Sequence, residues 1–337
     1  MKCCLKKDYK IITTSIIAIL IFISGCEENP ISTDNINGKT YIAFERSLSW
    51  SPDSTQLAYI SNNAIVIRSI LDNDVREFTG MGIYDQPVWS PDGSKIAFTS
   101  ATRDDSRAKI FVKNSDGTDV AKKLSTETAS YFHPRWSPDG KKIAFHSYQK
   151  RNMNIFVRNS DLTGGEIVIV RDPSSDRNAE WSPDGTKFAF ESDRSGNFDI
   201  WVVDSNGTNP AIQITSDLSE DTLPQWSHDG KRILFQSNRY GLIGVWVINA
   251  DGNGEAIHVS QGFAKAENAD WSPDDKWILF ISSNIAYARR SDGTGDPIKI
   301  ADALEARWSP DGKKIALIGL DEFEYKVKVI NVPDEIK

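Results

Sequence analysis

The chain has 337 residues, of which 39% are hydrophobic and 26% charged, and its formal net charge is −8. A chain of this length and composition can bury a sizeable core. The acidic balance, without a basic stripe interleaved with aromatic residues, argues against nucleic acid as a partner, because such a surface repels phosphate groups.

The first element in the chain is an apolar stretch over residues 11–23, preceded by lysines at positions 2, 6, 7 and 10. It is short for a membrane span and is typical of an export signal. It ends in Ile23-Ser24-Gly25-Cys26, which resembles the lipobox of bacterial lipoprotein signal peptides. The resemblance implies that residues 1–25 are a signal peptide and that Cys26 carries a diacylglycerol thioether with fatty acyl chains such as palmitate. Simple secretion and a retained anchor are the alternatives.

Glu27 follows Cys26, whereas the inner-membrane retention signal of enterobacterial lipoproteins has Asp there, so the outer membrane is favoured, on its periplasmic or surface face. Residues 26–40 are polar and lack periodicity, which predicts a flexible tether. Removing residues 1–25, with four Lys and one Asp, changes the net charge from −8 to −11. The cysteines are at positions 3, 4 and 26, so the mature chain cannot form an internal disulfide.

From residue 41 to the end the sequence is a repeat. The pentapeptide Trp-Ser-Pro-Asp-Gly, or a near copy, occurs seven times at spacings of 39, 47, 45, 45, 45 and 37 residues, close to the period of one four-stranded propeller blade. Pro sets φ, Asp bonds nearby backbone and Gly accepts a positive φ, so the pentapeptide predicts a tight turn. The tryptophans are expected to pack between blades: Trp50, Trp89, Trp136, Trp181, Trp226, Trp271 and Trp308.

Each unit holds further strand-like runs after this turn. Apolar and β-branched runs at 95–98 and 187–190 follow it directly, a second set at 110–112 and 200–203 lies about ten residues later, and a weaker run such as 211–215 closes the unit. Asp-Gly and Asn-Gly pairs between the runs are strong hairpin signals. The unit is therefore predicted to be a four-stranded antiparallel meander, which can bury its faces only against neighbouring copies.

The seventh unit stops after a run at 325–332, without a fourth strand, while residues 41–45 form a strand-like run outside any unit. Pairing the two would close the ring and remove an exposed edge. We therefore predict an all-β fold, a seven-bladed β-propeller over residues 41–337. A six-bladed ring, with one motif used in closure, is the alternative.

The repeat resembles the WD-repeat-like propeller unit of the TolB family, which also occurs in prolyl-oligopeptidase-like proteins. The pentapeptide turns carry the resemblance, together with Ser-Asp-Arg-Ser-Gly at 192–196 and Ser-Asn-Arg-Tyr-Gly at 237–241. TolB itself has an α/β domain before its propeller. The roughly fifteen residues between Cys26 and the first strand cannot hold that domain, so the chain resembles the TolB propeller alone.

Residues that could carry catalysis are few. The repeated turn aspartates are expected to stabilise turns rather than form a ring of carboxylates. His133 and His146 flank one turn and are expected to face each other across a hairpin, but the aligned positions of the next units offer no third imidazole. We therefore predict no metal site, no cofactor and no catalytic residue, since nucleophile-elbow, zinc-protease and P-loop motifs are also absent from the sequence.

The side chains one and three positions before each Trp vary from unit to unit, whereas the Trp-Ser-Pro-Asp sequence that follows them is nearly constant. This variation predicts a ligand or peptide mouth at the channel, and solvated rim residues are the alternative. The candidates are His133, Arg135, Asn178, Glu180, Gln225, Asn268, Asp270 and Arg307.

The sequence thus predicts a lipid-anchored envelope propeller that acts as a scaffold for a protein or peptide partner. An envelope enzyme, either a hydrolase or a lyase of peptide or polysaccharide, and a small-ligand sensor are the alternatives. An enzyme would be recognised by carboxylates or histidines with perturbed pKa values that converge on one channel mouth.

Overall fold

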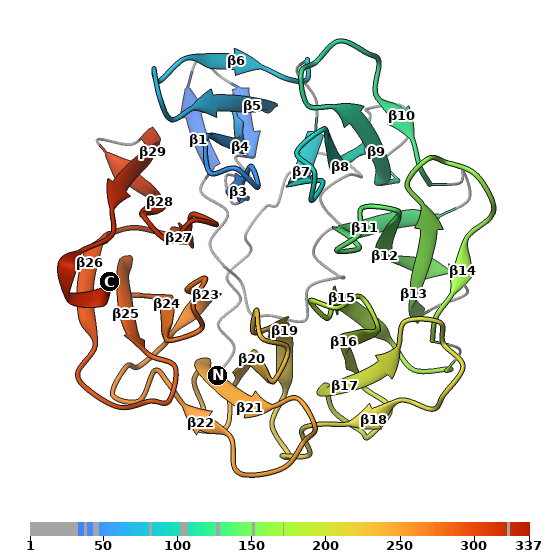
Figure 1. Ribbon diagram of the computed structural model, residues 1–337, viewed down its shortest axis with the longest axis vertical. Helices are drawn as coiled ribbons and strands as arrows, with labels where there is room; N and C mark the ends of the chain where they lie inside the picture. Colours follow the sequence, from blue (N-terminus) through green and yellow to red (C-terminus); the bar gives the residue numbers. More distant parts are fainter. Residues whose placement is uncertain are drawn as a thin grey trace, which may run out of the picture. The chain divides into compact units, whose positions relative to one another are not determined.

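The structure is a computed structural model (Figure 1). It describes residues 33–36, 39–42, 47–80, 83–101, 107–125, 129–149, 152–170, 172–321 and 324–337. The chain divides into two compact units, Met1–Ala43 and Phe44–Lys337. The predicted signal peptide and Cys26 lie outside the described residues. The domain boundaries at residues 25 and 40 stay predictions.

The first unit contains a two-stranded antiparallel sheet. Strand β1 (Thr33–Ile36) pairs with β2 (Lys39–Ile42), with Ile42 opposite Thr33. The sequence between the two strands is Asn-Gly, the dipeptide that most favours a two-residue hairpin. The expected pairing of residues 41–45 with the last blade is therefore wrong for Tyr41 and Ile42, which have a local partner strand. Residues 43–45 lie outside the described residues.

The second unit consists of seven antiparallel sheets arranged around a central axis (Figure 1). We call them blades 1 to 7, in chain order. Each is a meander in which consecutive strands pair, and the first strand lies nearest the axis. The prediction of seven blades is confirmed, and the six-bladed alternative is excluded.

The strands have the following bounds. Blade 1 contains β3 (Ser49–Trp50), β4 (Gln56–Ser61), β5 (Ala64–Ser69) and β6 (Val75–Glu77). Blade 2 contains β7 (Ile83–Trp89), β8 (Lys95–Ala101), β9 (Lys109–Asn114) and β10 (Lys122–Lys123). Blade 3 contains β11 (Ser130–Trp136), β12 (Lys142–Gln149), β13 (Asn152–Asn159) and β14 (Ile167–Val168). Blade 4 contains β15 (Asp176–Trp181), β16 (Lys187–Ser192), β17 (Asp199–Asp204) and β18 (Ile212–Gln213).

The remaining blades follow the same order. Blade 5 contains β19 (Asp221–Trp226), β20 (Arg232–Ser237), β21 (Gly244–Asn249) and β22 (Ile257–His258). Blade 6 contains β23 (Glu267–Trp271), β24 (Trp277–Ser282), β25 (Ile285–Arg290) and β26 (Ile298–Asp302). Blade 7 contains β27 (Glu305–Trp308), β28 (Lys314–Asp321) and β29 (Glu324–Asn331), and a 3-10 turn, Asp334–Ile336, follows.

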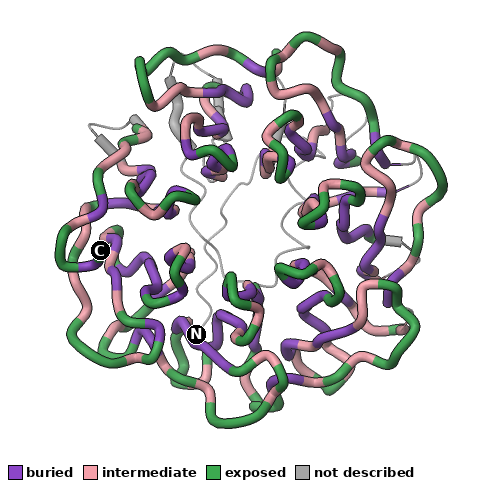
Figure 2. The backbone as a smooth tube through the Cα atoms, in the orientation of Figure 1, coloured by how far each residue is buried: buried purple, intermediate pink, exposed green. Residues whose placement is uncertain are grey.

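The core lies between the blades. Figure 2 shows buried residues along the inner strands and exposed residues on the turns. Each hydrophobic cluster draws from two neighbours, as where Val247 of blade 5 packs with Trp271 and Phe280 of blade 6. Six of the seven repeat tryptophans donate Nε1–H to the carbonyl oxygen of the residue just before the Trp of the preceding blade, at 3.1 to 3.3 Å. The tryptophans therefore join blades as well as fill space.

The seven Ser-Pro-Asp-Gly-type turns share one hydrogen-bond pattern. In each, the Ser hydroxyl donates to the Asp Oδ1 at 2.6 or 2.7 Å. The same Oδ1 accepts the backbone N–H two residues later. The aspartates are thus turn-forming residues, as the sequence predicts.

Blades 7 and 1 close the ring through contacts like those between other blades. The Leu48 N–H donates to Glu305 Oε1 at 3.3 Å, and Arg68 Nη1 donates to the Val327 carbonyl at 2.8 Å. Trp50 and Leu48 pack with Ile318 in one cluster. Blade-to-blade packing therefore joins the two ends of the repeat.

Candidate functional site

The innermost strands of blades 2 to 6 each contain a β-bulge near their end. The register with the second strand shifts between the residues four and one positions before the Trp. The residue three positions before the Trp has a positive φ in each: Gln86 (52°), His133 (55°), Asn178 (52°), Leu223 (52°) and Asn268 (53°). A positive φ is uncommon outside glycine, and a bulge redirects the side chains beside it. The fold therefore imposes this conformation on five unrelated side chains that line the channel.

Side chains one position before the Trp meet across blade boundaries. Arg135 of blade 3 donates Nε–H to Glu180 Oε2 of blade 4 at 2.9 Å, and both are partly exposed. Gln225 of blade 5 donates Nε2–H to Asp270 Oδ1 of blade 6 at 3.3 Å. The other oxygen of Asp270 accepts the Trp308 N–H of blade 7 at 2.8 Å. These contacts form a band of polar side chains on the channel side of blades 3 to 7.

A second chain of contacts crosses blades 2, 3 and 4. Gln86 Nε2 lies 3.1 and 3.0 Å from the two ring nitrogens of His133. The His133 ring stacks on His146, with centroids 4.9 Å apart. His146 Nδ1 accepts the Asn178 N–H at 3.3 Å, and Asn178 Nδ2 donates to Glu191 Oε1 at 2.7 Å. The predicted approach of the two histidines is therefore confirmed.

Glu191 is the centre of this network. Its carboxylate, fully buried, also accepts Arg177 Nε–H at 2.7 Å and the Leu223 N–H of blade 5 at 2.6 Å. The Arg177 guanidinium lies 4.0 Å from the centroid of the Phe198 ring. A buried carboxylate is tolerated when charged and polar donors surround it. Glu191 thus ties blade 4 to blade 5 just behind the channel.

Both histidines are held neutral. Burial, followed by the positive charges of Arg177 and Arg135, lowers the pKa of His146 to about 3. Burial and the neighbouring His146 lower the pKa of His133 well below its ordinary value. Because His146 Nδ1 accepts a backbone N–H, its proton sits on Nε2. The in-plane lone pairs of two stacked rings do not converge on one point, which disfavours a metal held by this pair.

Two carboxyl groups of the channel have raised pKa values. Burial raises the pKa of Asp85 to about 6, against hydrogen bonds from the Gln86 backbone and Ser47. Burial also raises the pKa of Asp270, against the positive charge of Arg307. Over the described ranges of the chain, no group of three or more His, Cys, Asp or Glu side chains is placed to hold a metal ion.

All eight candidate residues lie half-buried on innermost strands. His133, Arg135, Asn178 and Glu180 come together at blades 3 and 4. The second group is Gln225, Asn268, Asp270 and Arg307, at blades 5 to 7, where Asn268 Nδ2 donates to the Leu304 carbonyl at 3.1 Å and Arg307 Nη1 lies 3.4 Å from the Ala269 carbonyl oxygen.

Sequence reasoning missed Asp85, Leu223 and the central role of Glu191. Leu223 could have been predicted, because it stands three positions before a repeat Trp, at one of the two variable positions, whereas Asp85 stands four positions before one. Glu191 lies on the second strand of its blade, where the pattern predicts only core.

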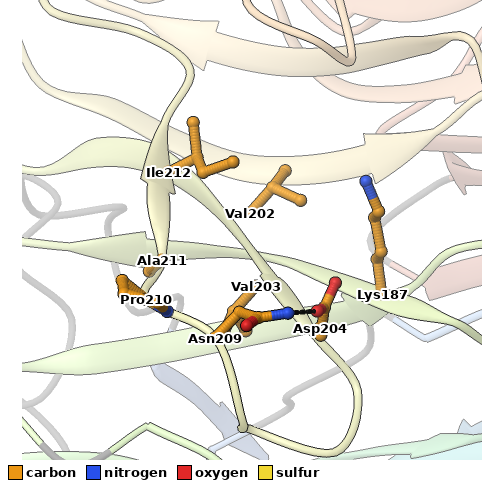
Figure 3. A pocket seen from close by; sticks show the side chains of 8 residues that line it. All are labelled: Lys187, Val202, Val203, Asp204, Asn209, Pro210, Ala211 and Ile212. Carbon is orange, nitrogen blue, oxygen red and sulfur yellow. Dashed lines mark hydrogen bonds between the residues drawn. The ribbon is translucent and has the colours of Figure 1, made fainter.

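A separate pocket of about 450 Å³ lies between β17 and β18, away from the innermost strands (Figure 3). Val202 and Ile212 line its apolar part, and Lys187 lies at its side. Asn209 Nδ2 donates to Asp204 Oδ2 within it. None of the predicted site residues lines this pocket.

Seven antiparallel blades, each with a Trp-Ser-Pro-Asp-Gly-type turn between its first two strands, define a β-propeller with a polar channel. The family model described as the TolB β-propeller domain matches residues 107–292, more than half of the chain. The chain belongs to this family. No curated protein matches its sequence. Within the part that the structure describes, no helix has the length and apolar character needed to cross a membrane.

Solved structures share the fold. A putative TolB from Agrobacterium tumefaciens is 19% identical, with a TM-score of 0.57 over 88% of this chain and 92% of that one. TolB from Acinetobacter baumannii is 20% identical, with a TM-score of 0.54, and the match covers 74% of this chain and 64% of that one, under two thirds of that protein. Oligogalacturonate lyase from Vibrio parahaemolyticus is 13% identical, with a TM-score of 0.70 over 86% of this chain and 90% of that one. At these identities the likeness is one of fold.

Proposed function

We propose that the protein is a lipid-anchored propeller of the bacterial cell envelope that binds a protein or peptide partner at one mouth of its channel. One observation carries the proposal. Polar side chains that differ from blade to blade meet across blade boundaries at the channel, as Arg135 meets Glu180 and Gln225 meets Asp270, while the surrounding turns are uniform. A constant frame with variable polar contacts suits recognition better than folding alone.

The side chains of this band differ in hydrogen-bonding chemistry. Arg135 and Arg307 are donors, Glu180 and Asp270 are acceptors, and Gln225 is both. An extended polypeptide offers alternating N–H and C=O groups and can pair with such a band. Membership of the TolB β-propeller family supports a scaffold of this kind.

The membrane anchor is the second part of the proposal. It rests on the lipobox that ends at Cys26 and on Glu27 behind it, which favours the outer membrane. A lipid at Cys26 would keep the propeller at the membrane surface, with residues 26–40 as the connection.

The test of the mouth is a pull-down from envelope extracts with the Arg135→Glu/Arg307→Glu double variant. Each substitution should weaken binding by more than about 1 kcal/mol, because interface energy concentrates in a few anchors. The matched control is Lys141→Glu/Lys313→Glu, which makes the same change in net charge on exposed turn residues. The control should keep every partner at full recovery. Full recovery with the mouth variant would move the site elsewhere.

A second candidate function, an envelope enzyme acting on an acidic polysaccharide, is favoured by the perturbed pKa values of Asp85, His133 and His146. A solved structure with the same fold is an oligogalacturonate lyase. The scaffold remains the better supported function. His146 is buried, and the Glu191 carboxylate already accepts hydrogen bonds from Arg177, Asn178 and Leu223, so neither group is free to act on a substrate.

Incubation with oligogalacturonate tests the enzyme directly, since elimination yields an unsaturated sugar that absorbs ultraviolet light. Turnover that disappears in His133→Ala, but not in His258→Ala, would replace the scaffold with the enzyme.

A further inference from the structure

Large apolar side chains are exposed on blade 5 and on the loop that leads into it. Leu218 is 96% exposed, Tyr240 is 75% exposed and Leu242 is 56% exposed. Leu223, the bulged residue of β19, is 44% exposed at the channel itself. We call these four residues, together with Asp217 and Glu220, the blade 5 strip. Exposed apolar groups that gather on one surface mark interaction sites more often than scattered ones do.

The loop that carries Leu218 is held in place by its neighbours. Asn197 of blade 4 donates Nδ2–H to the carbonyl oxygens of Asp217 and Ser219, at 3.1 and 2.6 Å. The Ser219 N–H donates to Asp217 Oδ1 at 2.9 Å. Leu218 therefore lies on a loop that is held by hydrogen bonds. Because the loop is already ordered, a partner that binds Leu218 loses little conformational entropy in the loop.

The Tyr240 loop is joined to the Leu218 loop. The Glu220 N–H donates to Asn238 Oδ1 at 3.0 Å, which places the two loops side by side at one end of blade 5. The Tyr240 ring lies 5.6 Å from Trp246 and 5.5 Å from His258, and these two rings stack on each other at 4.2 Å. Tyr240 is thus an exposed aromatic group on a fixed aromatic base.

The charge of the blade 5 strip is acidic. Asp217 and Glu220 are exposed on either side of Leu218. The nearby Arg239 forms an ion pair within the blade, with its Nη2 2.7 Å from Asp221 Oδ2. Its guanidinium also lies 4.9 Å from the Trp246 ring centroid. Its charge is therefore balanced within the blade, and the strip offers two carboxylates beside apolar anchors.

We infer that the blade 5 strip receives a basic, apolar segment of the partner polypeptide, whose adjoining residues occupy the channel mouth. This inference rests on the proposed function. In this arrangement the apolar side chains of the segment contact Leu218, Tyr240 and Leu242. Its Lys or Arg side chains pair with Asp217 and Glu220. Leu223 contacts the part of the segment that enters the channel. Complementary charge fixes partner choice and apolar anchors supply affinity.

The test uses labelled twelve-residue peptides and the exported full chain with Cys26→Ser, measured by fluorescence anisotropy. One peptide alternates Lys with Leu and Phe, a second has Glu for Lys, and a third has Ser for Leu and Phe. The basic apolar peptide should bind at least about tenfold more tightly than the other two. Leu218→Ser/Tyr240→Ser should remove this advantage, and Asp217→Lys/Glu220→Lys should transfer it to the acidic peptide.

The matched control is Leu71→Ser/Val120→Ser, which removes equally exposed apolar side chains from blades 1 and 2 and should leave binding unchanged. Equal affinity for all three peptides, or equal loss in the control, would overturn the inference. So would binding to phosphatidylcholine vesicles that depends on Leu218 and Tyr240, since the strip would then be a membrane contact.

The variants of the strip and of the mouth separate this inference from the proposed function. In the pull-down, the Arg135→Glu/Arg307→Glu variant could lose the envelope partner while the variants of the blade 5 strip recover it in full. This result would reject the strip as a binding surface and leave the proposed function in place. The reverse result would reject the channel mouth as a binding site, and with it the placement of adjoining partner residues there, and would leave the blade 5 strip as a binding surface.

Discussion

His228 and Asp275 form a hydrogen-bonded pair that joins the turns of blades 5 and 6. His228 stands where the other six turns have Pro, and its backbone N–H and its Nδ1 each lie 2.8 Å from Asp275 Oδ1. The Asp229 N–H donates to Asp275 Oδ2 at 2.8 Å. Asp275 stands where five turns have Gly and keeps the left-handed φ of 59°. Because Pro has no N–H and Gly no carboxylate, the pair requires both departures from the repeat.

This relationship predicts coupling between the two positions. Asp275→Gly should lower the free energy of unfolding by about 1 to 2 kcal/mol, because three donors lose their acceptor while the strain of a positive φ is relieved. The loss should shrink by about 1 kcal/mol in a His228→Pro background, where two of those donors are already gone. Urea unfolding of the two single variants and the double variant measures the coupling. Additive effects would show that the pair is independent.

The indole hydrogen bonds predict unequal effects for two equally buried tryptophans. Trp181 donates Nε1–H to the Arg135 carbonyl at 3.1 Å, whereas Trp308 Nε1 is buried with no partner among the described residues. Replacement by Phe removes similar apolar surface from both sites. Trp181→Phe should therefore destabilise the fold by about 1 kcal/mol more than Trp308→Phe. Equal losses in thermal or urea unfolding would refute a stabilising role for the bond.

Neutral His146 predicts a specific dependence of stability on pH. Its pKa is lowered to about 3 from an ordinary value of 6.5, so the unfolded chain binds a proton in this interval and the folded chain does not. The contribution of neutral His146 to the free energy of unfolding is complete above pH 6.5 and is lost as the pH falls toward 3. Between about pH 7.5 and pH 5, the wild type should lose on the order of 2 kcal/mol more than His146→Gln.

Phe145→Leu, a buried change on the same strand, is the control for this measurement. Its effect on the free energy of unfolding should be the same at both pH values, because no titrating group is removed. A His146→Gln difference that is equally constant would contradict the assignment of a neutral, buried imidazole.

Lipid anchoring predicts that Cys26→Ser moves the protein from the membrane fraction to the soluble envelope fraction, because the thioether needs the sulfur of Cys26. The wild type should remain with membranes and extract into detergent. Separation of the fractions by centrifugation gives the result. Membrane association that survives the substitution would mean that the chain is held by something other than this lipid.

The fold was largely predictable because the same turn-forming residues recur seven times in the sequence. Strand-like runs such as 95–98 and 200–203 lie within observed strands, and the turn aspartates bond as expected. The predicted strand pairing with the last blade was wrong for Tyr41 and Ile42, although blades 7 and 1 close the ring by packing against each other. Asn-Gly at positions 37 and 38 is a local hairpin signal that gives Tyr41 and Ile42 a nearby partner strand, whereas the number of strands in a unit does not determine which strands pair.

For the candidate site, the sequence determined which positions vary, and all eight of these residues lie on innermost strands at the channel. Only the tertiary structure decided how they are arranged. The contacts of Asn178 with His146 and of Leu223 with Glu191 each join residues of adjacent blades that are 32 positions apart in the chain. The positive φ of His133 and of Asn178 lies at the bulge in the pairing between the first two strands of each residue's own blade. Turns and strand periodicity are local and can be read from neighbouring residues. Burial, pKa values and contacts between blades arise only when distant segments pack together, so no local pattern contains them.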